Sequence, residues 1–427
     1  MRVTGGRVFA EGAFRSCDLG TDGSRIAWVG GPAATGAAPA TGAAPVTGGD
    51  SATDSVPASG KAPAADAPAT ATDAVSAIAV APPFPEKVEK VLDASGCFVI
   101  PGLIDLHFHG CVGHDFCEGT DEAIHAIARY EASRGVTSIC PATMTFPEDV
   151  LGPVMDAARA FSPADDEASL VGINMEGPFI SPNKVGAQNP AHVVSCDIDL
   201  FDRLQRRAGG LIKIVDVAPE EPGALEFIRA RSGTVRVSVA HTCANYDQAR
   251  RAFDEGCNHV THVCNAMPPL HHRDPSVIGA AHDSSHVMVE LICDGVHVHP
   301  AMTRALLALF GDERIVLISD TMEAAGLEDG RYSLGGQAVT VQGNRATLES
   351  GTIAGGVTDL AACLRVAVRE AGVPLEGAVR MAAENPARAL GIDGECGSLA
   401  PGKAADIVVL DEDLQVKHVI VRGKLIR

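Results

Sequence analysis

Residues 101–110, PGLIDLHFHG, join an apolar strand to a pair of histidines and decide the fold of the chain that follows. The Pro-Gly pair at 101–102 marks the start of a new domain. His107 and His109 stand two residues apart on a predicted strand, so both imidazoles point to the same face. Because imidazoles are common metal ligands, this pair is the first candidate for a metal site.

Beyond this stretch, apolar strands alternate with amphipathic helices as far as about residue 391. The predicted strands are short aliphatic runs at 136–140, 170–176, 212–220, 236–241, 259–263, 288–295 and 315–320. The clearest helical patterns lie between them, at 121–134, 224–231, 246–255 and 301–310. About eight strands alternating with helices over about 290 residues favour an α/β fold of the (β/α)8 TIM-like barrel type over an open sheet.

The two ends of the chain predict a second, smaller domain. Short strands separated by Gly and Asp turns occur in 1–33, 86–100 and 396–427, and we expect them to form one β-sandwich beside a barrel at 101–395. Residues 34–85 are mostly Ala, Thr, Pro, Gly and Ser. Such a segment buries too little apolar surface to offset its ordering entropy, which predicts a disordered insertion.

Composition excludes several classes of protein. The 427 residues carry 34 basic and 54 acidic side chains, a net charge of −20, which argues against a nucleic-acid or anionic membrane partner. A phosphorylated small substrate stays allowed, because one local arginine can dominate a pocket.

No stretch approaches the roughly 20 apolar residues of a membrane span, and no signal-peptide core opens the chain. The 12 dispersed cysteines favour reduced thiols, so we expect a cytoplasmic protein.

More ligand candidates fall at the carboxyl ends of predicted strands, where barrel active sites assemble. Glu176, His241 and Asp320 each end a strand, and His262 lies near the end of another. A single histidine at a strand end is usually just a hydrogen-bonded polar group, but six candidates in one alternating chain favour a shared site. Imidazoles and carboxylates converging in this way suit Zn²⁺ or another divalent ion. We assign most other histidines, His259 among them, to the surface or to local hydrogen bonds.

Several segments resemble a known family. PGLIDLHFHG resembles the opening motif of the amidohydrolase superfamily, and GSLAPGKAADIVVLD at 397–411 resembles its return to the small domain. More narrowly, the chain resembles the N-acetylglucosamine-6-phosphate deacetylase family through NMEGPFISPNKVGAQNP, THVCNAMPPLHHRDP, ICDGVHVHP and LISDTMEAAG. H-x-H is shared across the superfamily, whereas TH-x-x-NAM together with EGPF and DG-x-H is far more specific.

The resemblance implies a metal-dependent hydrolase that converts N-acetylglucosamine-6-phosphate to glucosamine-6-phosphate and acetate. Asp320 would act as general base and then general acid toward a metal-activated water. The implied ligands of a divalent ion, with Zn²⁺ expected first and Fe, Mn or Co as alternatives, are Glu176, His241 and His262. Some family members replace the H-x-H pair and hold one metal; here the pair is intact, so the resemblance implies one or two ions per subunit, the second held by His107 and His109.

The resemblance also implies substrate contacts. Asn265 and Ala266 match groups that hold the sugar phosphate, and His297 matches a substrate-binding histidine. Arg273 corresponds to an arginine that reaches the phosphate in the neighbouring subunit of family dimers, so a homodimer is expected. Gln188 stands where the family often has histidine near the acetyl group; it can donate a hydrogen bond but cannot carry a proton.

Two other interpretations stay open at this point. The chain could hydrolyse another N-acyl substrate, such as N-acetylgalactosamine-6-phosphate or an N-acyl amino acid. It could also be an inactive barrel with a structural or interaction role. The retention of every ligand position and of Asp320 counts against the second interpretation, because an inactive site need keep neither.

Overall fold

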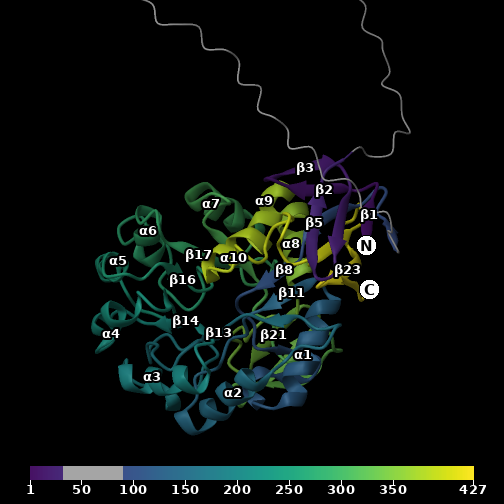
Figure 1. The fold of residues 1–427 in the computed structure, drawn as a ribbon. Helices are drawn as coiled ribbons and strands as arrows, with labels where there is room; N and C mark the ends of the chain where they lie inside the picture. The colour runs from purple at the N-terminus through teal and green to yellow at the C-terminus, as the bar shows by residue number, and fades with distance from the viewer. Residues whose placement is uncertain (32–89) are drawn as a thin grey trace, which may run out of the picture.

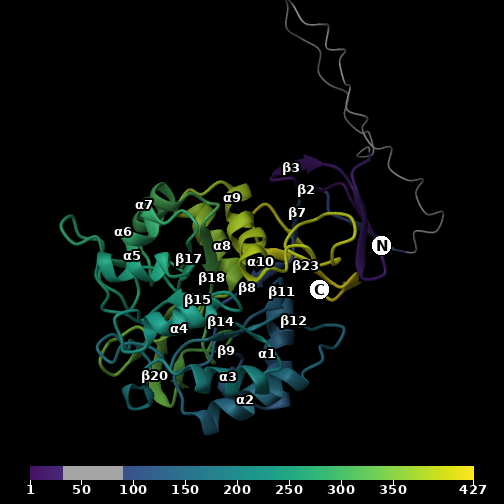
Figure 2. The same cartoon turned by 60° about the vertical axis from the view of Figure 1, so that its left-hand side comes forward.

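The structure, a computed structural model, describes residues 1–31 and 90–427. The segment 34–85, predicted to be a disordered insertion, lies outside the described residues. The described chain forms a large α/β body and a smaller all-β region (Figures 1 and 2). The N and C termini lie beside each other in the smaller region.

The body is built around parallel strands. A six-stranded sheet follows the order of the sequence, with β13 (Ile173–Met175), β14 (Ile212–Val217), β15 (Arg236–Val239), β16 (His259–Val260), β17 (Met288–Ile292) and β18 (Ile315–Ile318). A three-stranded sheet contains β12 (Ser169–Leu170), β11 (Val136–Ile139) and β8 (Leu103–Asp105). Strands β13, β17 and β18 are buried along their whole length, which explains why aliphatic side chains predominate in them.

Backbone contacts join the two parallel sheets on both sides. Ala142, after β11, forms a parallel bridge with Asn174 of β13. On the other side the amide of Asp320, after β18, donates to the carbonyl of His107, after β8, at 2.9 Å. The parallel strands therefore curl, and the segments that follow the first and last of them are hydrogen-bonded to each other at the carboxyl ends. The expected α/β fold with a curled parallel sheet is confirmed.

Helices connect the strands and cover the outside of the body (Figure 1). They are α1 (Asp121–Ser133), α2 (Glu148–Ala160), α3 (Ile198–Arg207), α4 (Ala224–Arg231), α5 (Tyr246–Asp254), α6 (Ser276–Asp283), α7 (Pro300–Phe310), α8 (Leu360–Arg369), α9 (Leu375–Val379) and α10 (Asn385–Leu390). The four helices expected from periodicity agree with these bounds to within one residue. Side-chain caps explain two of the starts, since Thr120 accepts from the amide of Ala123 and Asn245 forms a capping box with Gln248.

An antiparallel sheet between β18 and α8 was not predicted. It consists of β19 (Gly330–Leu334), β20 (Gln337–Gln342) and β21 (Arg345–Leu348). Buried and exposed residues alternate along β20, so Val339 and Val341 face inward and join Met144 and Met322 in one apolar cluster. The expectation of simple strand–helix alternation as far as residue 391 missed this sheet.

Both chain ends build the smaller region. One sheet orders β5 (Arg25–Val29), β4 (Leu19–Asp22), β1 (Arg2–Thr4) and β6 (Val91–Asp93). The other orders β24 (Lys424–Leu425), β23 (Val416–Val421), β22 (Ile407–Leu410), β7 (Phe98–Pro101), β2 (Arg7–Ala10) and β3 (Ala13–Ser16). Strand β7 pairs with β2 on one side and with β22 on the other, which brings the two ends of the chain together. Val3 and Leu19 of the first sheet share an apolar cluster with Val99 and Ile407 of the second.

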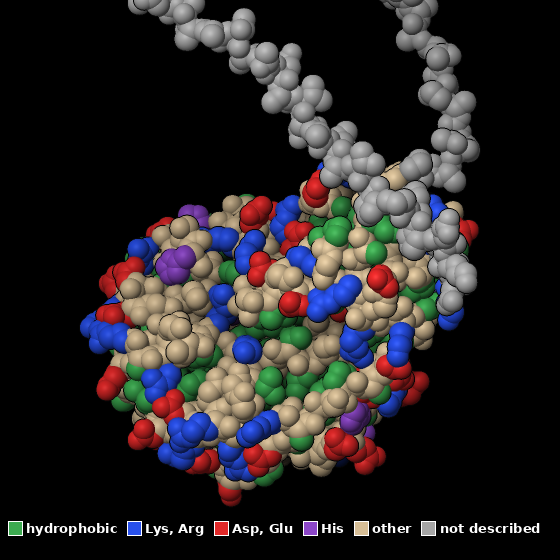
Figure 3. Space-filling model, in the orientation of Figure 1, with side chains coloured by type: hydrophobic (Ala, Val, Ile, Leu, Met, Phe, Trp, Pro, Cys, Tyr) green, Lys and Arg blue, Asp and Glu red, His purple; other side chains and the backbone are tan. Residues whose placement is uncertain are grey.

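The surface shows mixed charge. Lys and Arg side chains alternate with Asp and Glu on the face drawn in Figure 3 and do not gather into one stripe. Many are paired, as in the ion pair of Arg203 with Glu148 at 2.8 Å. That face therefore lacks the continuous basic track that a nucleic acid requires. Among the described helices, none combines the length and the apolar character needed to cross a membrane.

One carboxyl group in the core has no hydrogen-bond partner. Glu131 on α1 is 1% exposed, and both of its carboxylate oxygens are unpaired. Burial, and then the charge of Asp105, raise the pKa of Glu131 well above its usual 4.5. A carboxyl with a raised pKa holds its proton more tightly in the folded chain than in the unfolded chain. It therefore lowers the free energy of unfolding progressively as the pH rises above the unfolded pKa.

Substitution Glu131→Gln should remove this titration. We expect the free energy of unfolding of the variant, relative to that of the wild type, to rise by about 1 kcal/mol or more between about pH 5 and pH 8. Urea unfolding at several pH values measures the difference. The exposed Glu122 on the same helix provides the control, since Glu122→Gln should show no such trend. A difference between Glu131→Gln and the wild type that does not depend on pH would contradict this account.

Candidate active site

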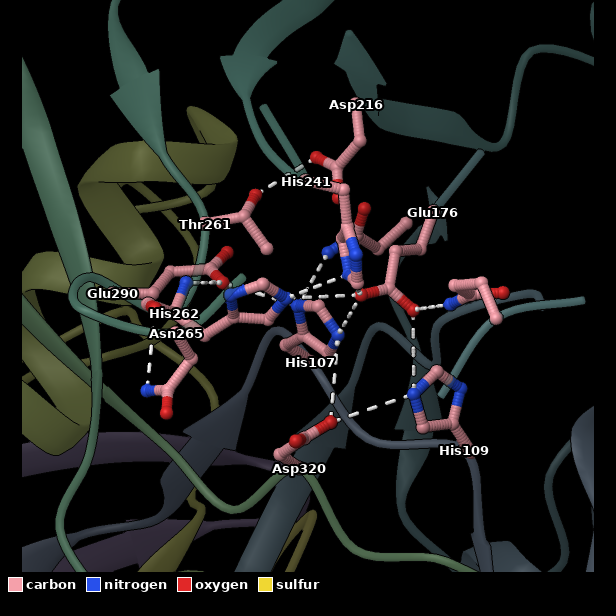
Figure 4. Close-up of polar contacts among 12 residues, drawn as sticks. His107, His109, Glu176, Asp216, His241, Thr261, His262, Asn265, Glu290 and Asp320 are labelled. Carbon is pink, nitrogen blue, oxygen red and sulfur yellow. Dashed lines mark hydrogen bonds and ion pairs between the residues drawn. The ribbon is translucent and has the colours of Figure 1, made fainter. Parts of the chain in front are cut away.

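Six side chains meet at the carboxyl ends of the parallel strands (Figure 4). They follow five different strands, namely β8, β13, β15, β16 and β18. All six are buried, and the most exposed, Asp320, is only 8% accessible. The structure therefore brings together the whole ligand and catalytic set expected from the sequence: His107, His109, Glu176, His241, His262 and Asp320.

Glu176 lies at the centre of a first group. Its Oε1 is 2.9 Å from Nε2 of His241 and 3.1 Å from Nε2 of His262, and these two nitrogens are 3.1 Å apart. Ligands about 2.0–2.1 Å from a tetrahedral metal ion lie about 3.3 Å from each other. The three atoms therefore have nearly the spacing of ligands around one ion.

A second group shares the same carboxylate. Nε2 of His107 is 3.4 Å from Oε1 of Glu176, and Nε2 of His109 is 3.4 Å from its Oε2. Asp320 Oδ1 approaches both rings, at 3.6 Å from His107 and 3.4 Å from His109. In each group the candidate ligand atoms lie within 4.8 Å of one another. Glu176 thus contacts two adjacent candidate metal sites.

The hydrogen bonds made by Nδ1 of His241 and of His107, on the side of each ring away from Glu176, indicate whether the cluster suits a cation. Nδ1 of His241 is 3.0 Å from the carbonyl oxygen of Lys184, and Nδ1 of His107 is 3.0 Å from a carboxylate oxygen of Glu290. Both oxygens only accept, so in its neutral form each ring carries its proton on Nδ1 and turns the lone pair of Nε2 toward Glu176. Lone pairs facing a carboxylate repel it unless a positive charge lies between them. The donor set therefore fits a divalent cation of the zinc type.

The local charges keep the carboxylates ionised. Burial opposes ionisation of Glu176, yet the charge and hydrogen bond of His107 and the bonds of the other imidazoles hold its pKa well below the usual range. Burial likewise opposes ionisation of Asp320, but its hydrogen bond to His109 and the nearby imidazoles lower its pKa. Burial disfavours charge on His107 as well, but the carboxylates of Glu176 and Glu290 raise its pKa well above 6.5, so a cation that binds Nε2 takes the place of a proton there. Ionised carboxylates are what a metal ligand and a general base both need.

The backbone is strained where the chain leaves the strands. His241, His262 and Asp320 have φ values of 41°, 27° and 51°, and Ala266 has 49°. Non-glycine residues rarely adopt this left-handed conformation, and it persists only where surrounding contacts hold it. Such strain concentrates at functional sites, and here it coincides with three members of the clustered set.

A cavity of about 240 Å³ opens onto the cluster. Met144, Leu334 and Ile353 form an apolar part of its wall. Leu334 belongs to β19, so the unpredicted antiparallel sheet helps to enclose the site. Four of the five residues expected to contact substrate also line the cavity: Gln188, Asn265, Ala266 and His297.

Two of these four side chains are held by neighbours. The amide of Thr145 donates to Oε1 of Gln188 at 2.7 Å, and Nε2 of Gln188 donates to Oε2 of Glu176 at 2.5 Å. Gln188 therefore orients the carboxylate shared by both candidate metal sites. Nδ1 of His297 lies 2.7 Å from Asp294, and its Nε2 points toward Asp320 at 3.9 Å. This arrangement leaves His297 beside the base, at the cavity wall.

Arg273 lies apart from the cavity. Its Nη1 is 2.7 Å from Nε2 of His272, and it lines a separate surface hollow with Tyr246 and Asp283. Within one chain, the structure does not bring this arginine to the cluster. Its expected action across a dimer interface stays a prediction.

Sequence reasoning missed the groups that support the ligands. Glu290 and Asp294 appear in the segments 288–292 and 293–297, but neither was singled out. A charged residue within the aliphatic run MVELI was an available signal, because such a residue is rarely buried without partners. The assignment of His259 to local hydrogen bonding is confirmed, since its Nε2 lies 3.0 Å from Glu290.

Comparison with known proteins agrees with this fold and site. Residues 98–426 match the amidohydrolase family, and the chain belongs to that family. The expected resemblance to N-acetylglucosamine-6-phosphate deacetylases is confirmed by relatives of nearly full length. The deacetylase of that name from Bacillus subtilis (strain 168) is 35% identical over 348 residues, which cover 80% of this chain and 87% of that protein.

Two further relatives are similar to the chain over most or all of its length. The N-acetylgalactosamine-6-phosphate deacetylase of Escherichia coli O157:H7 is 37% identical over 350 residues, or 82% of this chain and 92% of that protein. The solved structure of N-acetyl-D-glucosamine-6-phosphate deacetylase from Mycobacterium smegmatis is 31% identical, with a TM-score of 0.82 and complete coverage of both chains. A mutant of that protein has been solved in complex with N-acetyl-D-glucosamine-6-phosphate.

Zinc should stabilise the folded chain through this cluster. A ligand that binds only the folded state at 100 times its Kd adds about 2.7 kcal/mol to the free energy of unfolding. We therefore expect Zn²⁺ to raise the melting temperature of metal-free protein by several degrees in differential scanning calorimetry. His262→Asn should lose most of this increase, while the exposed His286→Asn should keep it. A full zinc response in His262→Asn would remove His262 from the ligand set.

Proposed function

We propose that the protein hydrolyses N-acetylglucosamine-6-phosphate to glucosamine-6-phosphate and acetate. The observation that carries this proposal is the buried cluster in which Glu176 faces imidazoles from three strands, with the ionised Asp320 beside them at the cavity. The motifs around these residues and the deacetylase relatives of nearly full length support the substrate class. An inactive barrel would have no need to keep such a costly set of buried charges.

We also propose the finer description of the fold. The eight strands β8, β11 and β13 to β18 would form one (β/α)8 barrel over residues 101–395. The pairing of Asp320 with His107 across the first and last strands supports this view. The two smaller sheets would form a β-sandwich domain from 1–33, 86–100 and 396–427, supported by their shared apolar cluster.

The residues proposed to hold metal are Glu176, His241 and His262 for one ion, with His107 and His109 for a second. A bound divalent ion would lower the pKa of a coordinated water and polarise the acetyl carbonyl. Zn²⁺ suits the nitrogen and oxygen donors best, and Fe, Mn or Co are the alternatives.

Asp320 is proposed to move the proton. Its carboxylate takes a proton from the attacking water as the new carbon–oxygen bond forms at the acetyl carbon. It then gives that proton to the sugar nitrogen as the carbon–nitrogen bond breaks, so one group acts first as base and then as acid. The lowered pKa of Asp320 supports the first step, and His297 beside it is suited to orient substrate or carboxylate.

Substrate binding is proposed to use both walls of the cavity. Asn265 and Ala266 would hold the sugar phosphate, while the amide of Gln188 steadies Glu176 and lies near the acetyl group. Arg273 would reach the phosphate from the neighbouring subunit of a homodimer, which accounts for its position outside the cavity of its own chain. The free thiols of the cysteines, which form no disulfide among the described residues, support the proposed cytoplasmic location.

Acetate release from a panel of sugars tests the function. We expect N-acetylglucosamine-6-phosphate to be hydrolysed far faster than unphosphorylated N-acetylglucosamine, and a chelator to abolish the reaction. N-acetylgalactosamine-6-phosphate belongs in the panel as a second candidate substrate, because the relative of that specificity is 37% identical. Absence of acetate from every phosphorylated sugar in the presence of zinc would reject the proposal.

Asp320→Asn should separate chemistry from binding. The amide keeps the size of the side chain but cannot take a proton, so we expect kcat to fall about 100-fold to 10,000-fold. Zinc content and KM should change little. Asp312→Asn is the control, because Asp312 pairs with Arg380 away from the cavity and its loss should leave kcat unchanged. Near-normal turnover in Asp320→Asn would remove Asp320 from the proton-transfer role.

Arg273→Ala should weaken binding of the substrate phosphate and leave the chemical step largely unchanged. Loss of an arginine that binds phosphate should raise KM for the phosphorylated sugar about tenfold or more, with a smaller effect on kcat. The exposed Arg331 offers a matched control, whose change to alanine should leave KM unaltered. An unchanged KM in Arg273→Ala would place Arg273 outside the pocket of either subunit.

A further inference from the structure

Strand β17 carries one charged residue in the middle of a buried aliphatic run. Glu290 is completely inaccessible, and its neighbours in the strand are Val289 and Leu291. Its oxygens accept from three groups. Oε2 is 3.0 Å from Nδ1 of His107 and 3.3 Å from the amide of His262, and Oε1 is 3.0 Å from Nε2 of His259. A buried carboxylate is costly unless it is paired in this way, so these bonds explain how the strand tolerates it.

The contacts of Glu290 set the protons on its partners. Nδ1 of His107 and Nε2 of His259 each lie 3.0 Å from one of its carboxylate oxygens. Carboxylate oxygens accept hydrogen bonds, so both ring nitrogens donate. In the neutral ring the remaining nitrogen of His107, Nε2, then turns its lone pair toward Glu176 and Asp320.

A second hydrogen-bond donor, the side-chain amide of Asn174, also faces Nδ1 of His107 and competes with Glu290 for that nitrogen. Nδ2 of Asn174 lies 3.3 Å from Nδ1 of His107, and its own direction is set by a 3.3 Å bond to the carbonyl of Leu106. Taken alone, that amide would favour a lone pair on Nδ1 and the proton on Nε2. With the proton on Nε2, His107 could not bind a metal. The shorter contact with the charged Glu290 outweighs the contact with Asn174.

We propose that Glu290 is a positioning residue that makes His107 a metal ligand by holding its proton on Nδ1, and that His259 keeps Glu290 in place. The proposal rests on the metal site of the proposed function and extends it to two residues in no candidate ligand set. Figure 4 shows Glu290 on the side of His107 that faces away from Asp320. The carboxylate thus supports the His107–His109–Glu176 site without touching that site's ion or the substrate.

Zinc titration of the metal-free protein against a competing chelator tests the proposal. The wild type should take up two ions. Glu290→Leu should weaken one of the two affinities 10-fold to 100-fold, the range found when hydrogen-bond partners of metal ligands are removed. The other affinity, at Glu176, His241 and His262, should stay within about threefold. Turnover should fall mainly in kcat, because Glu290 does not contact the cavity.

A conservative variant separates the hydrogen bond from packing. Glu290→Gln keeps an oxygen toward His107 and turns its amide toward His259, whose Nδ1 has no other partner and can take the proton instead. Zinc affinity should therefore stay within about threefold of the wild type in Glu290→Gln. Glu131→Leu, which removes another buried carboxylate that has no hydrogen bond to the cluster, is the matched control and should leave both affinities unchanged.

The outcomes decide between roles. A wild type that binds one ion, a Glu290→Leu variant that binds both ions normally, or a Glu290→Gln variant as weak as Glu290→Leu would each overturn the proposal. If the predicted zinc pattern appears but no acetyl sugar is hydrolysed, the proposed function fails and the role of Glu290 stands.

Discussion

The carboxylate of Glu176 meets four imidazoles in a buried space, and this crowding shapes the rest of the molecule. His107, His109, His241 and His262 reach it from three other strand ends, at 2.9 to 3.4 Å. A curled parallel sheet is one of few scaffolds that can direct so many side chains to one point. The left-handed turns after the strands complete the geometry, and their strain is tolerated because the surrounding core is closely packed.

Several of the polar groups that face the cluster are oriented by a hydrogen-bond partner behind them. A carbonyl orients His241, a carboxylate orients His107, and the amide of Gln188 orients Glu176. Asp294 does the same for His297 at the cavity wall. Such pairs restrict the rings to one orientation and one proton position, so a bound ion would meet ligands that need little rearrangement. The apolar wall contributed by β19 lowers the local polarity and strengthens every charge interaction inside.

Much of this arrangement could be predicted because it follows from local patterns. Unbroken aliphatic runs indicate parallel strands, and the residues that end them, such as Glu176 and Asp320, must share one edge of the sheet. The supporting groups were harder to find. Glu290 lies in mid-strand, where a sequence does not reveal which distant side chain a carboxylate meets. The sheet at 330–348 was missed because exposed polar residues interrupt its strands, and Arg273 cannot be assigned to a pocket that its own chain does not form.

The pairing of β7 with both β2 and β22 has a consequence for how the chain is made. Ribosomes release the N-terminal strands first, and β22 emerges about 300 residues after β7. Until then one edge of β7 has no backbone partner, and an unpaired edge invites association with other chains. Nascent protein must therefore keep that edge shielded throughout synthesis, and loss of the last two dozen residues would expose it permanently. Quality control by the cell would then respond to loss of the C-terminal residues, although these lie far in sequence from His107 and His109.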